Sequence, residues 1–165
     1  MMIFTLEPAA YFAPQLNHKI IEASFDVENE WFFYDGAFNS TSLDQNSCNT
    51  WMYEKFVAVT KGEIFAYFEG IWTRPLDIVT SFRLINFNKK HPYTSVLAFF
   101  KYLDYLFVCR GCQAFNWTVA LQNERALTQY ERFVKNYCGH KVGSRTHAQK
   151  SYTGKISDIN IYELT

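Results

Sequence analysis

Residues 78–121 read IVTSFRLINFNKKHPYTSVLAFFKYLDYLFVCRGCQAFNWTVAL, and this stretch decides the fold. Its first part, Ile78–Phe87, is rich in β-branched and aromatic residues and predicts a strand. Over Thr94–Cys109 the apolar residues recur at helical spacing, and Gly111 then provides a natural helix stop. The last part, Ala114–Leu121, is a short apolar run typical of a buried strand. A strand, a crossover helix and a second strand predict one parallel pair.

The chain before this unit predicts a strand, a helix and two further strands. A polar stretch at 37–50 predicts a surface loop, and Lys61-Gly62 predicts a tight turn. Two strands joined by that turn, followed by the strand at 78–87, predict an antiparallel meander. The elements expected here are strand Met2–Glu7, helix Gln15–Phe25, strand Tyr53–Thr60 and strand Glu63–Trp72.

The chain after this unit predicts a helix and a final hairpin. The helix is expected over Glu124–Tyr137, with Asn123 as its N-cap. The hairpin strands are expected at His140–Tyr152 and Lys155–Leu164. The fold class is therefore α/β (α+β), a mixed and mostly antiparallel central sheet with one parallel pair and helices on both faces. We expect a single domain over residues 1–165.

Composition and charge exclude several classes of protein. With 48% hydrophobic and 19% charged residues, the chain is not of the disordered type. Sixteen Lys+Arg balance sixteen Asp+Glu, so we expect no nucleic-acid partner; the alternative rests on a local basic cluster over Lys135–Lys155. No apolar run approaches the ~20 residues that span a bilayer, and we expect no membrane partner. Without a signal peptide, the four cysteines predict reduced thiols and a cytoplasmic protein.

Residues 123–164 carry a second pattern, in which NERALTQYER is followed by GHKVG and by TGKISDINIYEL. Asn123 follows a predicted strand, the small Ala126 comes three residues later and Tyr130 seven residues later. This pattern and the element order resemble the GNAT superfamily of N-acetyltransferases. The resemblance implies a GNAT-like sheet whose parallel pair splays apart, and transfer of an acetyl group from acetyl-CoA to a primary amine.

The resemblance also implies where acetyl-CoA, the expected co-substrate, is held. The family's phosphate loop, Arg/Gln-x-x-Gly-x-Gly/Ala, is degenerate here, because residues 91–96 contain no glycine. The helix N-terminus, two hydroxyls and nearby positive charges remain to attract an anion. Because side chains replace the glycines, we expect weaker cofactor binding or none. The cofactor-binding residues implied are Asn86, Phe87, Lys89, Lys90, His91, Thr94, Ser95, Val96, Asn123, Ala126 and Tyr130.

Tyr130 is implied as the general acid that protonates the leaving thiolate of CoA. The alternative is one more aromatic residue on an amphipathic helix. A general base is less evident: we select Glu69, with Asp77, His91 and His147 as alternatives, and each of these also fits an exposed surface residue. A chain of water molecules is the remaining route for the proton of the amine.

The acceptor is expected to be a small-molecule or peptide amine. The family builds its acceptor wall from the segment that here contains Trp31, Phe33 and Tyr34, and Trp72 is expected to join them. The alternative is that these rings cover the sheet. A homodimer is a further expectation that the sequence leaves open.

No metal site is expected. The alternative is a zinc site formed by Cys109, Cys112, Cys138 and His140. The competing function is a catalytically inactive GNAT-fold binding or structural module with an apolar patch for a partner. The transferase hypothesis requires that the gap between the parallel strands is open and is not filled by the ring of Tyr93.

Overall fold

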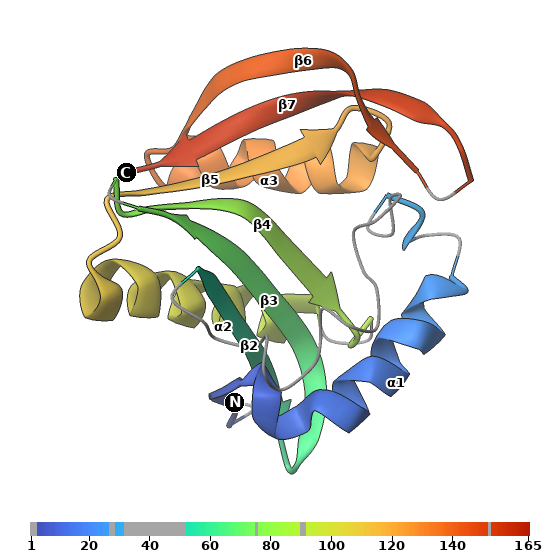
Figure 1. Cartoon of the computed structure of the whole chain (residues 1–165), viewed down its shortest axis with the longest axis vertical. Coiled ribbons are helices and arrows are strands. Elements are labelled where there is room, and N and C mark those ends of the chain that lie inside the picture. The colour runs from blue at the N-terminus through green and yellow to red at the C-terminus, as the bar shows by residue number, and fades with distance from the viewer. Residues whose placement is uncertain (1–2, 27–28, 32–51, 75, 90–91, 152) are drawn as a thin grey trace.

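Seven strands in the described part of the chain form one sheet in the order β1-β2-β3-β4-β5-β7-β6 (Figure 1). The computed structural model describes residues 3–26, 29–31, 52–74, 76–89, 92–151 and 153–165. The parallel pair is β4–β5, and the other neighbours are antiparallel, so the predicted mixed sheet is confirmed. The strands are β1 (Thr5–Pro8), β2 (Tyr53–Thr60), β3 (Glu63–Thr73), β4 (Ile78–Asn86), β5 (Ala114–Ala120), β6 (His140–Lys150) and β7 (Ile156–Leu164).

The α-helices in these residues are α1 (Ala13–Ser24), α2 (Pro92–Asp104) and α3 (Glu124–Asn136). The α-helix expected to run to Cys109 stops at Asp104, and a π-helical turn continues it over Tyr105–Cys109. The apolar spacing in the sequence does not distinguish this wider turn from an α-helix. None of the helices in the described ranges has both the length and the apolar character needed to cross a bilayer.

The meander β2–β3–β4 forms as predicted. Lys61 and Gly62 have φ angles of 51° and 81°, as a tight two-residue hairpin turn requires. β1 includes Pro8, which was expected to end it. Pro8 is tolerated because β1 is an edge strand and needs no second partner.

The helices cover different faces of the sheet (Figure 1). α2 and α3 pack on one face, against a cluster of rings that includes Phe82, Phe115 and Trp117. Ring centroids in this cluster lie 4.8–6.5 Å apart, a range in which each pair adds about 0.5–1.5 kcal/mol beyond area burial. α1 packs on the opposite face through Leu16 and Ile20. The aromatic composition thus serves mainly the α2/α3 face.

β4 and β5 pair only at their beginning. Ile78 is opposite Ala114 and Val79 is opposite Phe115, and no further pairs follow. A bulge in β4 accompanies the separation, because Glu69 pairs with Arg83 but Ile71 pairs with Thr80. Two β4 residues, 81 and 82, therefore face one β3 residue, and such a bulge bends its strand. The strands then diverge, as the splay expected from the resemblance requires (Figure 1).

Candidate functional site

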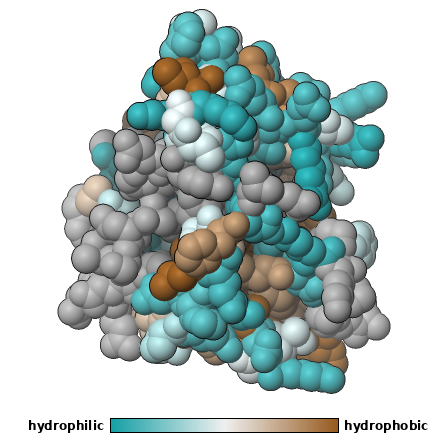
Figure 2. Space-filling model, turned by 90° about the vertical axis from the view of Figure 1, so that its right-hand side faces the viewer, coloured by the Kyte–Doolittle hydropathy of each residue, from teal (hydrophilic) through white to brown (hydrophobic). Residues whose placement is uncertain are grey.

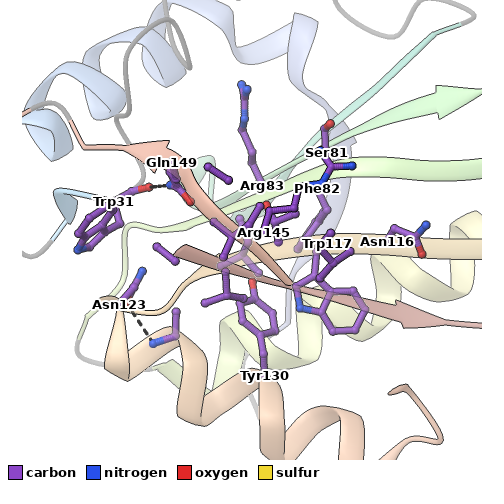
Figure 3. Close-up of a pocket in the computed structure, with 18 of the residues that line it drawn as sticks. Trp31, Ser81, Phe82, Arg83, Asn116, Trp117, Asn123, Tyr130, Arg145 and Gln149 are labelled. Atoms are coloured by element: carbon purple, nitrogen blue, oxygen red, sulfur yellow. Dashed lines mark hydrogen bonds between the residues drawn. The ribbon is translucent and has the colours of Figure 1, made fainter. Parts of the chain in front are cut away.

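A cavity of about 570 Å³ lies where β4 and β5 diverge (Figure 3). Side chains alternate between the two faces of a strand. Phe82 and Trp117 belong to the α2/α3 face, whereas their neighbours Arg83 and Thr118 point to the opposite face, and all four line the cavity. The gap is therefore lined by side chains from both faces of the sheet.

α3 supplies the wall on its own face. Asn123, Ala126 and Tyr130 all line the cavity, so the structure brings these three predicted residues together. Asn123 is the N-cap, as predicted: its Oδ1 accepts a hydrogen bond of 3.2 Å from the backbone N–H of Ala126. The small Ala126 packs against the ring cluster, so the helix lies close to the sheet.

Tyr130 is held by ring packing. Its ring lies against Trp117 with centroids 5.6 Å apart, and Trp117 stacks on Tyr162 at 5.7 Å. Burial raises the pKa of Tyr130 above its ordinary value of 10.0, so the phenol stays protonated near neutral pH. No residue in the described structure hydrogen-bonds to its hydroxyl. The proton of Tyr130 is therefore available to a ligand.

Two polar atoms of β5 at the cavity are buried without a partner in the described structure. They are the indole N–H of Trp117 and Oδ1 of Asn116, one donor and one acceptor from adjacent residues of β5. Buried polar groups are rarely left without a hydrogen bond. Neighbouring residues on a strand face opposite sides, so one atom is offered to each side of the gap.

Glu69 is buried, which corrects the expectation of an exposed residue. It is 4% exposed, its Oε2 accepts a 2.8 Å hydrogen bond from the Tyr67 hydroxyl, and its Oε1 lies 3.6 Å from Nη1 of Arg83. Arg83 lines the cavity and Glu69 does not. The carboxylate therefore holds Arg83 and does not face the cavity as a base would. Asp77 is half-buried, and its Oδ1 lies 3.0 Å from Nη1 of Arg74.

Trp72 does not join the cavity wall. It is 2% exposed, and its indole N–H donates a 3.0 Å hydrogen bond to Glu54. The guanidinium groups of Arg74 and Arg110 lie 5.0 and 5.8 Å from its ring. Trp72 instead covers the sheet, as the alternative predicted. It is paired with Val79, at the end of β4 that is still joined to β5.

Trp31 lines the cavity, and contacts with the β6–β7 hairpin hold its segment in place. Its carbonyl accepts a 2.9 Å hydrogen bond from Nε2 of Gln149 (Figure 3). The adjacent Glu30 is buried and binds Ser151 at 3.0 Å, Lys155 at 2.9 Å and the hydroxyl of Thr153. These hydrogen bonds lower the pKa of Glu30, and the bond from Thr153 has the largest effect. Phe33 and Tyr34, expected beside Trp31, lie outside the described residues.

The loop after β4 was expected to meet the cofactor's phosphates, and none of its described residues lines this cavity. Ser95 is buried, and its hydroxyl donates a 2.7 Å hydrogen bond to Asn86, so this proton is not offered to a phosphate. Lys89 is paired with Asp26. The backbone N–H of Phe87 continues the pairing with β3 through the carbonyl of Phe65, at 2.9 Å.

The start of α2 leaves the splay open. Tyr93 is 71% exposed and does not line the cavity, so its ring does not fill the gap. Thr94, in the first turn of α2, is half-buried, and Val96, in the next turn, is exposed. Lys90 and His91 lie outside the described residues.

The zinc alternative is wrong. Cys109 and Cys138 are exposed, and Cys112 is buried with its thiol against the carbonyl of Ala114 at 3.0 Å. Within the described ranges, no three or more His, Cys, Asp or Glu side chains gather so that they could hold a metal ion.

Sequence reasoning missed the cavity residues of β6, which are Arg145, Ala148, Gln149 and Lys150. The sequence gives little indication of them, because most residues of β6 are exposed and its apolar residues do not alternate with polar ones. Only its pairing with β7 shows that Arg145 lies beside Ile159, another cavity residue.

No protein-family model and no curated protein sequence matches this chain. Solved structures match it over nearly its whole length. A ribosomal-protein alanine N-acetyltransferase from Escherichia coli has 16% identity and a TM-score of 0.66, covering 98% of this chain and 93% of its own. RimJ of Mycobacterium smegmatis, in complex with CoA-disulfide, has 14% identity and a TM-score of 0.70, covering 99% and 82%. Spermidine N-acetyltransferase from Vibrio cholerae, in complex with CoA and spermine, has 14% identity and a TM-score of 0.66, covering 98% and 94%. The chain therefore has the fold of the GNAT acetyltransferases, as the sequence resemblance implied.

Proposed function

We propose that this GNAT-fold protein is an N-acetyltransferase that moves the acetyl group of acetyl-CoA to a primary amine. One observation carries the proposal: the cavity between β4 and β5 is lined from both faces of the sheet and contains Tyr130. Direct transfer needs the thioester and the amine to meet from opposite sides, and positioning of this kind supplies much of the rate. Fold neighbours in complex with CoA support the choice of co-substrate.

The residues of the chain fit acetyl-CoA, which supplies an activated acyl carbon and a thiolate leaving group. The unpartnered N–H of Trp117 lies on the α2/α3 face, where it can donate a hydrogen bond to a carbonyl of the co-substrate. Asn123 and Ala126 flank the same wall. For the phosphates we propose the first turn of α2, where free backbone N–H groups and the helix dipole favour anions. Thr94 adds a hydroxyl there.

Tyr130 donates the proton to the departing sulfur. A free thiol has a pKa of about 8.5 in water, so an ordinary phenol would give up its proton to a thiolate only uphill. Burial raises the pKa of Tyr130 further, but a thiolate withdrawn from solvent beside it also gains proton affinity. The phenol therefore first stabilises the sulfur as a hydrogen-bond donor and then transfers its proton.

The amine must lose a proton before it attacks. Among the described residues that line the cavity there is no carboxylate and no imidazole. We therefore propose that water, and not Glu69, carries this proton away. The amine nitrogen itself can donate to the unpartnered Oδ1 of Asn116.

The test combines acetyl-CoA binding with a Tyr130→Phe variant. We expect calorimetry to show acetyl-CoA binding in both proteins, and kcat for thiol release to fall roughly 10²–10⁴-fold in the variant. Tyr137→Phe is the matched control, because it removes a hydroxyl just after the same helix and outside the cavity. Full activity of Tyr130→Phe would exclude the acid role. Absence of both heat and thermal shift with acetyl-CoA would contradict the transferase proposal.

The inactive binding module is the second candidate, and one observation favours it. The phosphate loop has no glycine, and the hydroxyl of Ser95 is used internally. This candidate predicts no acetyl-CoA binding and an apolar patch. On the face shown in Figure 2, apolar residues occur in small separate groups among mainly hydrophilic ones.

We also propose a cytoplasmic location, supported by the free thiols of Cys109, Cys112 and Cys138.

A further inference from the structure

The charges of the cavity wall are all of one sign. Among the described residues that line it, Arg83, Arg145 and Lys150 are cationic and none is acidic. The chain as a whole has sixteen Lys+Arg and sixteen Asp+Glu, so this excess is local and does not follow from composition.

Arg83 and Arg145 lie on the side of the gap opposite α3, and Lys150 lines the cavity at the end of β6, where it is paired with Ile156. Arg83 neighbours Phe82, whose ring faces α2 and α3, and therefore points the other way. Arg145 is paired in register with Ile159, which is paired with Ala120 of β5. Residues paired across strands share a face, and the adjacent rings of the α2/α3 cluster occupy the other face. Arg83 and Arg145 thus place positive charge on the acceptor side, away from Tyr130.

Two of these cations have no ion-pair partner in the described structure. The charge of Arg83 is compensated by Glu69, 3.6 Å away. Arg145 and Lys150 make no described ion pair. Gln149, between them in sequence, is tied to Trp31, so this end of β6 is fixed against the cavity.

Two carboxylates near this end of the hairpin have other partners. Glu30 is bound by Lys155, Ser151 and Thr153. Asp158 accepts a 2.9 Å hydrogen bond from the backbone N–H of His147. Neither carboxylate makes an ion pair with Arg145 or Lys150 in the described structure.

We propose that the acceptor is a primary amine that also carries a carboxylate, which binds to Arg145 and Lys150 while the amine reaches the gap beside Asn116. This inference rests on the proposed acetyl transfer and names its substrate class. A carboxylate gains charge-assisted hydrogen bonds from the wall. A polyamine is repelled by it, since like charges placed together cost free energy and suppress wrong partners. The carboxylate belongs to a free amino acid or to an acidic peptide.

The experiment compares acceptors that differ by one charge. The probes are L-alanine and L-alaninamide, the peptides Ala-Glu-Ala and Ala-Gln-Ala, each with a free N-terminus and an amidated C-terminus, and spermidine. We measure kcat/KM for acetylation and, by saturation-transfer NMR with unreactive CoA present, binding of each probe. In the wild type we expect about a tenfold preference for the acidic member of a pair, as a charged hydrogen bond of ~1.5 kcal/mol provides. Which pair shows it separates the small-molecule source from the peptide source.

The variants assign the preference to the wall. In Arg145→Gln/Lys150→Gln we expect the acid-to-amide ratio to fall to about one, with acetyl-CoA affinity unchanged. Lys141→Gln is the matched control, because Lys141 is an exposed lysine of β6 that does not line the cavity; it should retain the wild-type ratio. Melting temperatures establish that all three proteins fold.

The outcomes separate this inference from the proposed function. If acetyl-CoA binds but spermidine or the amide probes are used as well as the acidic ones, the inference is overturned and the transferase proposal stands. A charge preference that survives in Arg145→Gln/Lys150→Gln also overturns it. If acetyl-CoA does not bind and no amine is acetylated, the proposed function fails, and the substrate class fails with it.

Discussion

Gly70 of β3 occupies the position where the splay begins. It faces the two bulged residues of β4, and a Cβ added to it would lie 2.5 Å from Cγ1 of Val79 and 2.9 Å from the hydroxyl of Tyr102. Val79 is in turn one of the two β4 residues that pair with β5. A Gly70→Ala substitution would therefore displace Val79 and weaken the pairing of β4 with β5.

The expected cost follows from these contacts. Moving Val79 by about 1 Å to reach ordinary contact is an overpacking defect, which costs about 1–3 kcal/mol. Replacing glycine also lowers the conformational entropy of the unfolded chain, which stabilises the folded state by about 0.4–1 kcal/mol and offsets part of the loss. We expect a net loss of about 1–2 kcal/mol, and hence a Tm lower by about 3–6 °C for a domain of this size.

The assay is thermal unfolding followed by circular dichroism, with Gly143→Ala as the control. A Cβ at Gly143 meets nothing within 4 Å, so this variant should keep the wild-type Tm or raise it slightly, since restricting the unfolded chain is its only expected effect. Val79→Ala removes the contacted methyl groups, and the double variant should lose less stability than the sum of the single ones. A Gly70→Ala protein that melts at or above the wild-type temperature would refute the argument that close packing at the junction of β4 and β5 requires glycine at position 70.

Two further predictions concern the elements that frame the cavity. Asn123→Ala should cost about 1 kcal/mol, because the N-cap hydrogen bond to Ala126 is lost; chemical denaturation measures this, and Asn123→Asp, which keeps an acceptor at the cap, should lose much less. Glu30 has a folded-state pKa below its ordinary 4.5, so its contribution to stability is present above that pH and is lost as pH falls through the folded-state value. Urea unfolding between about pH 3 and 7 should therefore show a flatter pH dependence for Glu30→Gln than for the wild type, and identical slopes would contradict the role of the Lys155 and Thr153 contacts.

Local signals in the sequence predicted most elements and part of the site. The Lys61-Gly62 turn and the crossover helix follow from residue type and spacing, which act over a few residues. Asn123, Ala126 and Tyr130 recur at three and seven residues, so one helix face carries all three wherever that helix packs. The N-cap role of Asn123 needed no tertiary information.

The burial of Glu69 and Trp72 could not be predicted from neighbouring residues. Both are polar or amphipathic residues on a strand, and the sequence does not tell which strand covers them. Glu69 is buried because β2 and β4 flank it and supply Arg83, and Trp72 is buried because Glu54 satisfies its indole N–H. These partners lie 14 and 18 residues away along the chain.

The sequence alone determined that this chain forms a mixed sheet with one parallel pair and a helix carrying Tyr130, because periodicity, turn residues and capping are properties of neighbouring residues. Only the tertiary structure decided that β4 and β5 part after two pairs, that Trp31 and β6 close the gap, and that Arg145 and Lys150 give its wall a positive charge. The reason is physical: a cavity is formed by strands whose register and separation depend on distant pairing partners, and no short stretch of sequence contains that information.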